Sequence, residues 1–320
     1  MQKKLIPNFK SAQEAYFSLL RYVISQGEKV KSVSDPKSVG SHFGVRNRDF
    51  IEARGLGFTI SNPRNRIVFS NHRKISLGFC IANAIWMLSG ENSIERIVAY
   101  NKKGIAFSDN GIYYEAAFGD RIFGKNNQWE FAEKLLNTDI NSRRIVIPIF
   151  FKEDLVNLPK DTPCAESIQL MVRSNKLDFF LTMRSQSLYA VFPYDIFLFT
   201  FLHEFLAQLL SLPIGKFYYY CKSLHIYEEE LDDVEKSLAE KTQRVYKMPK
   251  MPKSDWLLVK EILSREEAIR ENAPHSTYTR PIPRYWDEFL RILSLKIRKE
   301  ETPNSPPQLV NFFNLSESYL

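Results

Sequence analysis

Apolar residues recur every three to four positions in several separate segments of the chain. This spacing predicts a helix over Asn8–Ile24, ended by Gly27, and an apolar helix over Leu77–Leu88. The same spacing predicts further helices over Gln128–Leu136, Ile196–Leu212, Trp256–Glu271 and Tyr285–Arg298. The charged segment Glu228–Lys241 is typical of a helix with a solvated face, and Lys247–Lys253 of an extended linker.

Shorter apolar runs predict the strands. The predicted strands are Gly57–Ile60, Arg66–Phe69, Ile145–Phe151 and a hairpin over Ile168–Met183. The hairpin is expected to turn at Asn175 and Lys176, because asparagine favours turn conformations. His225 and Tyr227 flank Ile226 on a predicted strand, so both rings are expected on the same side.

The composition is that of a folded domain. The chain has 320 residues, of which 44% are hydrophobic and 13% aromatic. That length allows one large domain or two ordinary ones, with a sizeable core. Phe192–Leu212 is interrupted by Asp195, His203 and Glu204, so it predicts a buried helix rather than a membrane span. No second histidine stands at helical spacing, so no metal site is predicted.

Cysteine content and charge narrow the class of protein. Cys80, Cys164 and Cys221 are too few and too irregular for a disulfide framework, and no signal peptide is recognisable, so a reducing cytoplasm is expected. The formal net charge is +7. Because no nucleic-acid-binding signature accompanies this charge, it favours phosphate-bearing substrates over nucleic acid.

Five short motifs follow one another through the middle of the chain. They are Ser142-Arg143-Arg144, Pro163-Cys164, Met183-Arg184-Ser185, Phe192-Pro193-Tyr194-Asp195 and His225-Ile226-Tyr227. Taken singly, the arginine pair is ordinary surface charge and the cysteine an ordinary core residue. In this order and spacing the motifs resemble thymidylate synthases and the related pyrimidine-nucleotide hydroxymethylases. The resemblance covers Asn8 to Glu230.

The resemblance implies a fold of the thymidylate-synthase type. This is an α+β fold in which a large mixed sheet has flanking helices and packs against its twin in a homodimer. Residues 1–300 are expected to form this domain and residues 301–320 a C-terminal tail. In the family the arginine pair, here Arg143 and Arg144, crosses the dimer interface to the partner's substrate phosphate. Arginine suits this role because its planar fork pairs with two phosphate oxygens at once.

The resemblance also implies roles for the other motif residues. Cys164 is the expected nucleophile, whose thiolate adds to carbon 6 of a pyrimidine nucleotide monophosphate, with Arg184 nearby favouring the thiolate. The implied ligands are Arg143, Arg144, Arg184 and Ser185 for the phosphate, Asp195 and Gln169 for the base, and His225 and Tyr227 for the sugar. The family's one-carbon donor is 5,10-methylenetetrahydrofolate.

Asp195 stands where thymidylate synthases carry an asparagine that pairs with uracil. An ionised carboxylate offers only acceptors, so it suits the exocyclic amine of cytosine and a protonated N3. The resembling cytidylate hydroxymethylases carry aspartate here, which points to CMP or dCMP. The alternative is an acid that merely complements the positive end of the following helix.

Several positions depart from the family pattern. Asn83 and Phe118 replace a glutamate and a tyrosine that manage protons at the pyrimidine, and Ala165 replaces a histidine. Ser187 and Val191 stand where an aspartate and a glycine meet the folate, so folate use is doubtful. The candidate substitutes are Glu166, Asp120, Tyr113 and Tyr114, and the candidate arginines for the family's phosphate loop are Arg46, Arg48 and Arg54.

Two functions therefore stay open. One is transfer of a one-carbon unit, most simply hydroxymethylation, to carbon 5 of a cytosine nucleotide. The other is a degenerate relative that binds a pyrimidine nucleotide for regulation or for a different nucleotide reaction. Each lost acid/base group costs roughly 10²–10⁴-fold in rate, so several losses together are able to end the reaction.

Overall fold

The computed structural model describes residues 6–31, 48–157, 159–240, 246–272 and 281–300. Within them the strands are β1 (Asn8–Phe9), β2 (Glu28–Val30), β3 (Phe50–Ile60), β4 (Val146–Pro148), β5 (Ala165–Arg173), β6 (Lys176–Met183), β7 (Gln186–Ser187) and β8 (Ile214–Tyr227). These eight strands form one sheet whose main path is β1-β3-β8-β6-β5-β4. The predicted tail, residues 301–320, lies outside the described residues, as do Arg46 and Lys241.

The sheet is mixed. β3 runs antiparallel to β8, and β5 runs antiparallel to both β4 and β6, whereas β6 and β8 are parallel. β5 and β6 form the predicted hairpin, but its two-residue turn is Ser174-Asn175, one residue earlier than expected. Both turn residues have positive φ, 50° and 55°, as a tight hairpin turn that matches the strand twist requires.

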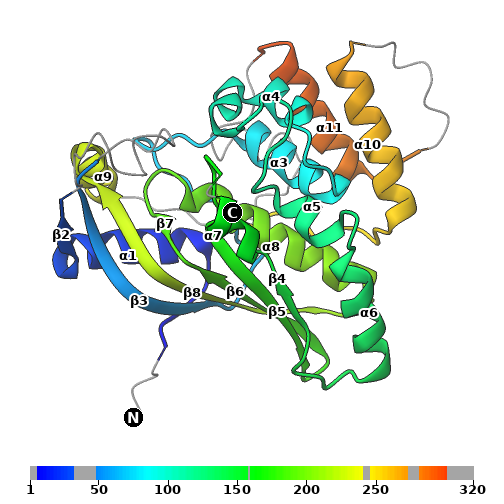
Figure 1. Ribbon diagram of the computed structural model, residues 1–320, viewed down its shortest axis with the longest axis horizontal. Helices are drawn as coiled ribbons and strands as arrows, with labels where there is room; N and C mark the ends of the chain where they lie inside the picture. The colour runs from blue at the N-terminus through cyan, green and yellow to red at the C-terminus, as the bar shows by residue number, and fades with distance from the viewer. Residues whose placement is uncertain (1–5, 32–47, 158, 241–245, 273–280, 301–320) are drawn as a thin grey trace.

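Helices gather on the sheet (Figure 1). They are α1 (Ala12–Gln26), α3 (Leu77–Ser89), α4 (Glu95–Tyr100), α5 (Phe118–Phe123), α6 (Gln128–Thr138), α7 (Lys152–Asn157), α8 (Phe192–Leu209), α9 (Leu231–Leu238), α10 (Trp256–Arg270) and α11 (Arg284–Ile297), with short 3₁₀ helices η1 (Lys102–Phe107) and η2 (Glu228–Glu230). The predicted charged helix is thus split into η2 and α9.

Helix α8 is the central helix of the core. It is apolar on all sides, and its residues 195–207 are all buried, as expected for a helix covered all round. Phe192 packs edge-on against Tyr219 of the sheet, and Phe201 packs edge-on against Trp286 of α11. The helix begins at Phe192, four residues before the predicted start, because Pro193 is tolerated in a first turn where its missing N–H would be unpaired anyway.

The predicted strand Arg66–Phe69 is wrong. The segment pairs with no strand in the described part of the chain, although Ile67 and Val68 are 5% and 0% exposed. The backbone of Phe69 is satisfied instead by the side chain of Gln13, which donates to the carbonyl over 2.8 Å and accepts from the N–H over 2.6 Å. A side-chain amide on α1 therefore takes the place of a neighbouring strand.

No helix in the described part of the chain is long and apolar enough to cross a membrane. The polar pair inside α8 has local partners instead. His203 hydrogen-bonds the carbonyl of Leu177 over 2.6 Å. Glu204 forms an ion pair with Arg66 and accepts a hydrogen bond from the N–H of Met251 over 3.0 Å. The side chains of Arg66 and Glu204 are 0% and 2% exposed, so each charge depends on the other.

Replacing Arg66 by methionine leaves the Glu204 carboxylate buried without its counter-charge. We expect a loss of about 3–5 kcal/mol in the free energy of unfolding, measured by urea denaturation. The double variant Arg66→Met/Glu204→Leu should recover part of the loss. As a matched control, Lys134→Met removes an exposed pair with Glu130 and should cost less than about 1 kcal/mol. A single Arg66→Met variant as stable as this control would contradict the prediction.

Candidate active site

The open end of the β5–β6 hairpin brings Cys164 beside Arg184. Ala165 pairs with Met183, so the residues just outside the two strands become neighbours. The N–H of Arg184 donates to the carbonyl of Cys164 over 2.8 Å. The guanidinium donates to the carbonyls of Thr162 and Pro163, each over 2.8 Å, and its Nη2 lies 3.9 Å from the Cys164 sulfur. The hairpin therefore holds one cation against the thiol.

Burial has the largest effect on the pKa of the Cys164 thiol. It raises the pKa of Cys164 to about 12, against the lowering effect of Arg184, while Asp161 and Asp195 raise it further. Thiolate is therefore scarce in the unliganded protein at neutral pH.

Tyr114 and Asp161 lie beside the cysteine. Their side chains hydrogen-bond one another, and burial raises the pKa of both. The Tyr114 ring meets Trp86 of α3 edge-on, with centroids 5.6 Å apart. Cys164 is among the groups that raise the pKa of Tyr114, so the two side chains are near enough to interact electrostatically. Tyr114 is the candidate substitute with such an interaction.

The other three candidates to replace the lost acid/base groups are not seen to interact with Cys164 in the described structure. Glu166 pairs with Lys222 over 2.6 Å, and Tyr113 is 48% exposed. Asp120 lies in the first turn of α5, where burial raises its pKa. None of these three has a described interaction with Cys164.

Asp195 is buried at the start of α8. Gln186 of β7 donates to its Oδ2 over 2.9 Å, and the Tyr219 hydroxyl of β8 donates to Gln186 Oε1 over 2.8 Å. Burial raises the pKa of Asp195 to about 7, although the Gln186 hydrogen bond lowers it. The carboxyl is therefore present in both acid and carboxylate forms at neutral pH.

His225 and Tyr227 lie together on β8, as predicted. Their ring centroids are 4.9 Å apart, and Ser187 of β7 pairs with His225. Burial lowers the pKa of His225 to about 4, so the ring is neutral at pH 7. Its Nδ1 and the Ser187 hydroxyl are buried with no hydrogen-bond partner among the described residues. Arg48 stacks over the Tyr227 ring, with its guanidinium carbon 3.6 Å from the centroid.

The remaining predicted ligands lie outside this cluster. Arg143 and Arg144 are exposed just before β4, and the Gln169 amide donates to the Arg143 carbonyl over 2.9 Å. Gln169 is thus tied to the arginine loop rather than to Asp195. Ser185 follows Arg184 and is half-buried, with no hydrogen bond from its hydroxyl within the described ranges. Arg54 pairs on the surface with Glu28.

Two of the five positions that depart from the family pattern, Phe118 and Ala165, are packed as apolar structure. Phe118 packs against Phe199 of α8, with ring centroids 5.2 Å apart, and Ala165 is completely buried. Asn83 is half-buried on α3, and Val191 is 42% exposed just before α8. The Ser187 hydroxyl is buried with no hydrogen-bond partner among the described residues.

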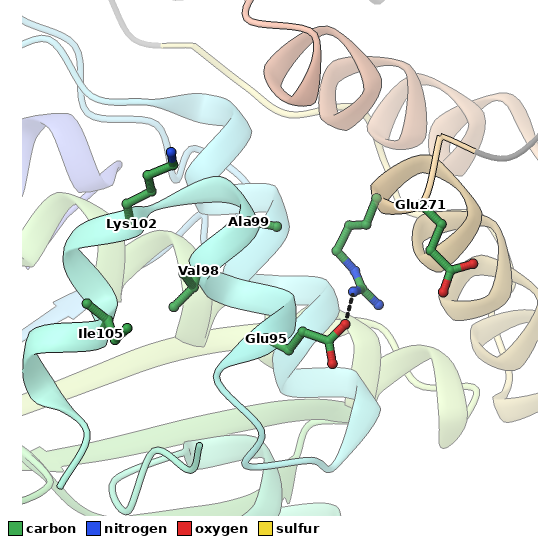
Figure 2. A pocket seen from close by; sticks show the side chains of 7 residues that line it. Glu95, Val98, Ala99, Lys102, Ile105 and Glu271 are labelled. Atoms are coloured by element: carbon green, nitrogen blue, oxygen red, sulfur yellow. Dashed lines mark hydrogen bonds and ion pairs between the residues drawn. The ribbon is translucent and has the colours of Figure 1, made fainter. Parts of the chain in front are cut away.

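A separate pocket lies between α4, η1 and α10 (Figure 2). Val98 and Ile105 supply apolar surface, and Arg270 already pairs with Glu95 over 3.1 Å and with Glu266 over 2.9 Å. None of the residues predicted to bind or attack a nucleotide lines it. The cysteine cluster is therefore the better candidate for the active site.

The described structure is an α+β fold in which a mixed sheet carries a cysteine–arginine pair at the open end of a hairpin. The family model described as thymidylate synthase matches residues 14–256, so the chain belongs to the thymidylate synthase family. The predicted fold is thereby confirmed, while the pairing of two sheets in a dimer stays a prediction.

Individual relatives and structures agree with this assignment. A deoxyuridylate hydroxymethyltransferase of Bacillus phage SP01 is 25% identical over 305 residues, covering 90% of this chain and 74% of the relative. A thymidylate synthase of Mycoplasma mobile is 23% identical over 270 residues, covering 74% of this chain and 88% of the relative. The structure of thermostable thymidylate synthase A from Bacillus subtilis superimposes with a TM-score of 0.61 at 17% identity, covering 76% of this chain and 90% of that one.

Sequence reasoning missed three residues of the cluster: Asp161, Gln186 and Tyr219. Asp161 precedes the Pro-Cys pair by two residues, and Gln186 directly follows Arg184-Ser185. Because both residues stand beside recognisable motifs, the sequence could have indicated that they belong to the site. The sequence gives no such indication for Tyr219, because it is one of three consecutive tyrosines and only the sheet shows which of them faces inward.

The raised pKa predicts how Cys164 reacts with iodoacetamide. The rate should rise about tenfold per pH unit from pH 7 to pH 9 without a plateau, because only thiolate reacts and its fraction grows with pH. Mass spectrometry separates Cys164 from Cys80 and Cys221, which are 1% and 0% exposed and should react more slowly. Arg184→Met should slow the reaction further. A plateau near neutral pH would show that the thiol is already ionised.

Proposed function

We propose that the protein transfers a one-carbon unit, most simply as a hydroxymethyl group, to carbon 5 of a pyrimidine nucleotide monophosphate. The observation that carries this proposal is the Cys164 thiol, 3.9 Å from the Arg184 guanidinium, with Tyr114 and Asp195 near enough to interact electrostatically with it. The relatives named deoxyuridylate hydroxymethyltransferase and thymidylate synthase support the reaction class.

The proposed first step is addition of the Cys164 sulfur to carbon 6. Asp161, beside the thiol, accepts its proton, and the electrons of the C5–C6 double bond move towards N3. The acid form of Asp195 supplies a proton to N3, which leaves carbon 5 as an enamine-like nucleophile. Once Asp161 has returned its proton to water, the Tyr114–Asp161 pair is available to carry the carbon 5 proton away. These two residues take over work that Asn83 and Phe118 cannot do.

The nucleotide is proposed to bind across the end of the sheet. Arg184 and Ser185 take the phosphate, and His225 and Tyr227 take the sugar hydroxyl. The neutral His225 ring, with a buried Nδ1 that lacks a partner among the described residues, suits a hydroxyl rather than a charge. The carboxylate form of Asp195 offers only acceptors, which suits the amine of cytosine, so CMP or dCMP is the proposed substrate.

The donor is proposed to be a one-carbon folate, on the strength of the family. The folate positions of this chain fit it less well than the nucleotide positions do. Ser187 offers a buried hydroxyl in place of a carboxylate, and Val191 adds a side chain where the family has glycine. No step is assigned to the folate for that reason. The second candidate function is nucleotide binding without transfer, which the packed, apolar Phe118 and Ala165 favour.

We expect the wild-type protein to release tritium from carbon 5 of labelled CMP or dCMP. Addition at carbon 6 makes that hydrogen labile, so release reports the adduct directly. Cys164→Ala should abolish release while leaving nucleotide affinity near normal. Tyr114→Phe should reduce release by roughly 10²–10⁴-fold, because it removes a proton-transfer group.

Methylenetetrahydrofolate is varied in the same assay. Release that requires Cys164 and rises with folate supports transfer. Tight nucleotide binding without release from either nucleotide would assign the protein to the binding class. Labelled UMP and dUMP test the choice of base.

The active form is proposed to be a homodimer that pairs two sheets. Phe180 of β6 and Tyr218 of β8 stack at 4.2 Å and neither is fully buried, while Val146 and Tyr220 are 51% and 45% exposed. Apolar strand side chains left uncovered on a sheet support an interface there. The exposed Arg143 and Arg144 precede β4 at the edge of this sheet, consistent with donation to the partner's site.

Sharing of active sites predicts complementation between two inactive variants. Arg143→Ala/Arg144→Ala lacks the arginines that it would lend, and Cys164→Ala lacks the nucleophile. Mixed under conditions that exchange subunits, they should regain about a quarter of wild-type release, because half the dimers are mixed and each has one complete site. The matched control mixes Cys164→Ala with Arg184→Ala, whose defects fall in one subunit's own site, and should regain nothing. Failure of the first mixture while both variants remain dimeric would exclude shared sites.

A further inference from the structure

A chain of two buried side chains, Gln186 and Tyr219, lies behind the carboxyl of Asp195. The Tyr219 hydroxyl donates to Gln186 Oε1 over 2.8 Å, and Gln186 Nε2 donates to Asp195 Oδ2 over 2.9 Å. Gln186 is 1% exposed and Tyr219 is 2% exposed, so water does not compete for these bonds. Asp195 Oδ1 has no hydrogen bond to any described residue.

The chain has one favoured direction. Reversing the Gln186 amide would place its Oε1 against Oδ2 of an ionised Asp195, and two acceptors cannot bond. In the acid form, reversal would require the Tyr219 hydroxyl to accept from Nε2 instead of donating to Oε1, so the Tyr219 hydrogen bond holds the direction there. With Nε2 facing Asp195, Oδ2 acts as an acceptor in both forms of the carboxyl. The proton of the acid form therefore resides on Oδ1, the oxygen that Gln186 leaves open.

This asymmetry matters because a free carboxylic acid does not discriminate between pyrimidines. It has one donor and one acceptor, and moving its proton from one oxygen to the other exchanges them. One arrangement matches cytosine, which offers an acceptor at N3 and a donor at its amine. The other matches uracil, which offers a donor at N3 and an acceptor at O4. Holding the proton on a fixed oxygen removes one of the two matches.

We propose that Gln186, held in place by Tyr219, is a positioning residue that makes Asp195 select one pyrimidine base, by keeping Oδ2 an acceptor and leaving Oδ1 to meet the base. The inference rests on the proposed binding of a pyrimidine nucleotide in this pocket. It does not rest on the transfer reaction. It also assigns a function to two residues that have no role in the proposed chemistry.

The other ionisable groups near Asp195 affect how much acid form is present rather than where its proton lies. They are Asp161, Cys164, Tyr114 and Tyr219. Within the described ranges, Gln186 is the side chain with a hydrogen bond to the Asp195 carboxyl. Orientation of the carboxyl therefore depends on Gln186.

The test is the ratio of dissociation constants for CMP and UMP, and for dCMP and dUMP, measured by calorimetry on the full chain at about pH 6. Asp195 is then largely in its acid form, since its pKa is about 7. Wild-type protein should prefer one base by about tenfold or more, because the wrong base leaves buried polar groups unpaired. Gln186→Leu should bring the ratio close to one, mainly by tightening binding of the disfavoured base.

Conservative variants separate positioning from packing. Gln186→Glu should keep discrimination at low pH, where its protonated carboxyl donates to Oδ2, and lose it as pH rises. Tyr219→Phe frees the amide to reverse and should lose part of the discrimination. The matched control is Tyr285→Phe, which deletes a buried hydroxyl on α11 that has no partner among the described residues, and it should leave the ratio unchanged.

Wild-type discrimination that persists in a folded Gln186→Leu variant overturns the inference, as does a wild-type ratio near one. If Gln186→Leu does not fold, as judged by circular dichroism, Tyr219→Phe decides by the same ratio. Because binding is measured, the result is separable from the proposed reaction. If Gln186→Leu loses base discrimination and the wild-type protein releases no tritium, the role of Gln186 is upheld and transfer is rejected. If the variant keeps discrimination and the wild-type protein releases tritium, transfer is upheld and the role of Gln186 is rejected.

Discussion

Burial of α8 between the sheet and the outer helices is the constraint on which the other features depend. The helix is apolar on every side, so it is stable only when elements cover it all round. β6 and β8 cover it from below, and α3 and α11 lie on its other side (Figure 1). Its first turn carries Asp195 into a dry pocket, and its middle carries Glu204 to the buried Arg66. The same packing thus creates the core and buries the Asp195 carboxyl.

Dry surroundings also explain the electrostatics of the site. Burial raises the pKa of Cys164, Asp161, Tyr114 and Asp195 and lowers that of His225, so each shift favours the uncharged form. Arg184 is the neighbouring cation that opposes this trend at the cysteine. A site kept nearly neutral in this way has little negative charge to repel a nucleotide phosphate. Hydrogen bonds with fixed direction, such as that from Gln186 to Asp195, then decide how its polar groups meet a ligand.

The C-terminal helices extend the core beyond the segment that matches the family. That match ends at residue 256, where α10 begins. α10 and α11 pack on α3 and α4 (Figure 1), and the buried carboxylate of Glu266 joins Arg96, Tyr100 and Arg270. This ion-pair cluster ties α10 to α4, and α11 covers α3, the helix that carries Asn83. Both C-terminal helices therefore pack against α3.

Local patterns were enough for the periodic elements and for residues in recognisable motifs. The spacing of apolar residues predicted the long helices to within a few residues at each end, and the hairpin with a turn displaced by one residue, but not the six-residue helices α4, α5 and α7. The order of the motifs predicted the family, and the structure brings Cys164 together with Arg184, and His225 with Tyr227. These features depend on neighbours in the sequence or on a single strand register.

The strand predicted at Arg66–Phe69 failed because Gln13, more than fifty residues away, satisfies the backbone of Phe69. Tyr114, Asp161, Gln186 and Tyr219 meet around Cys164 and Asp195 only because the hairpin, α8 and β8 converge there. Contacts between segments far apart along the chain, and the dry surroundings that shift their pKa values, exist only once the core has packed.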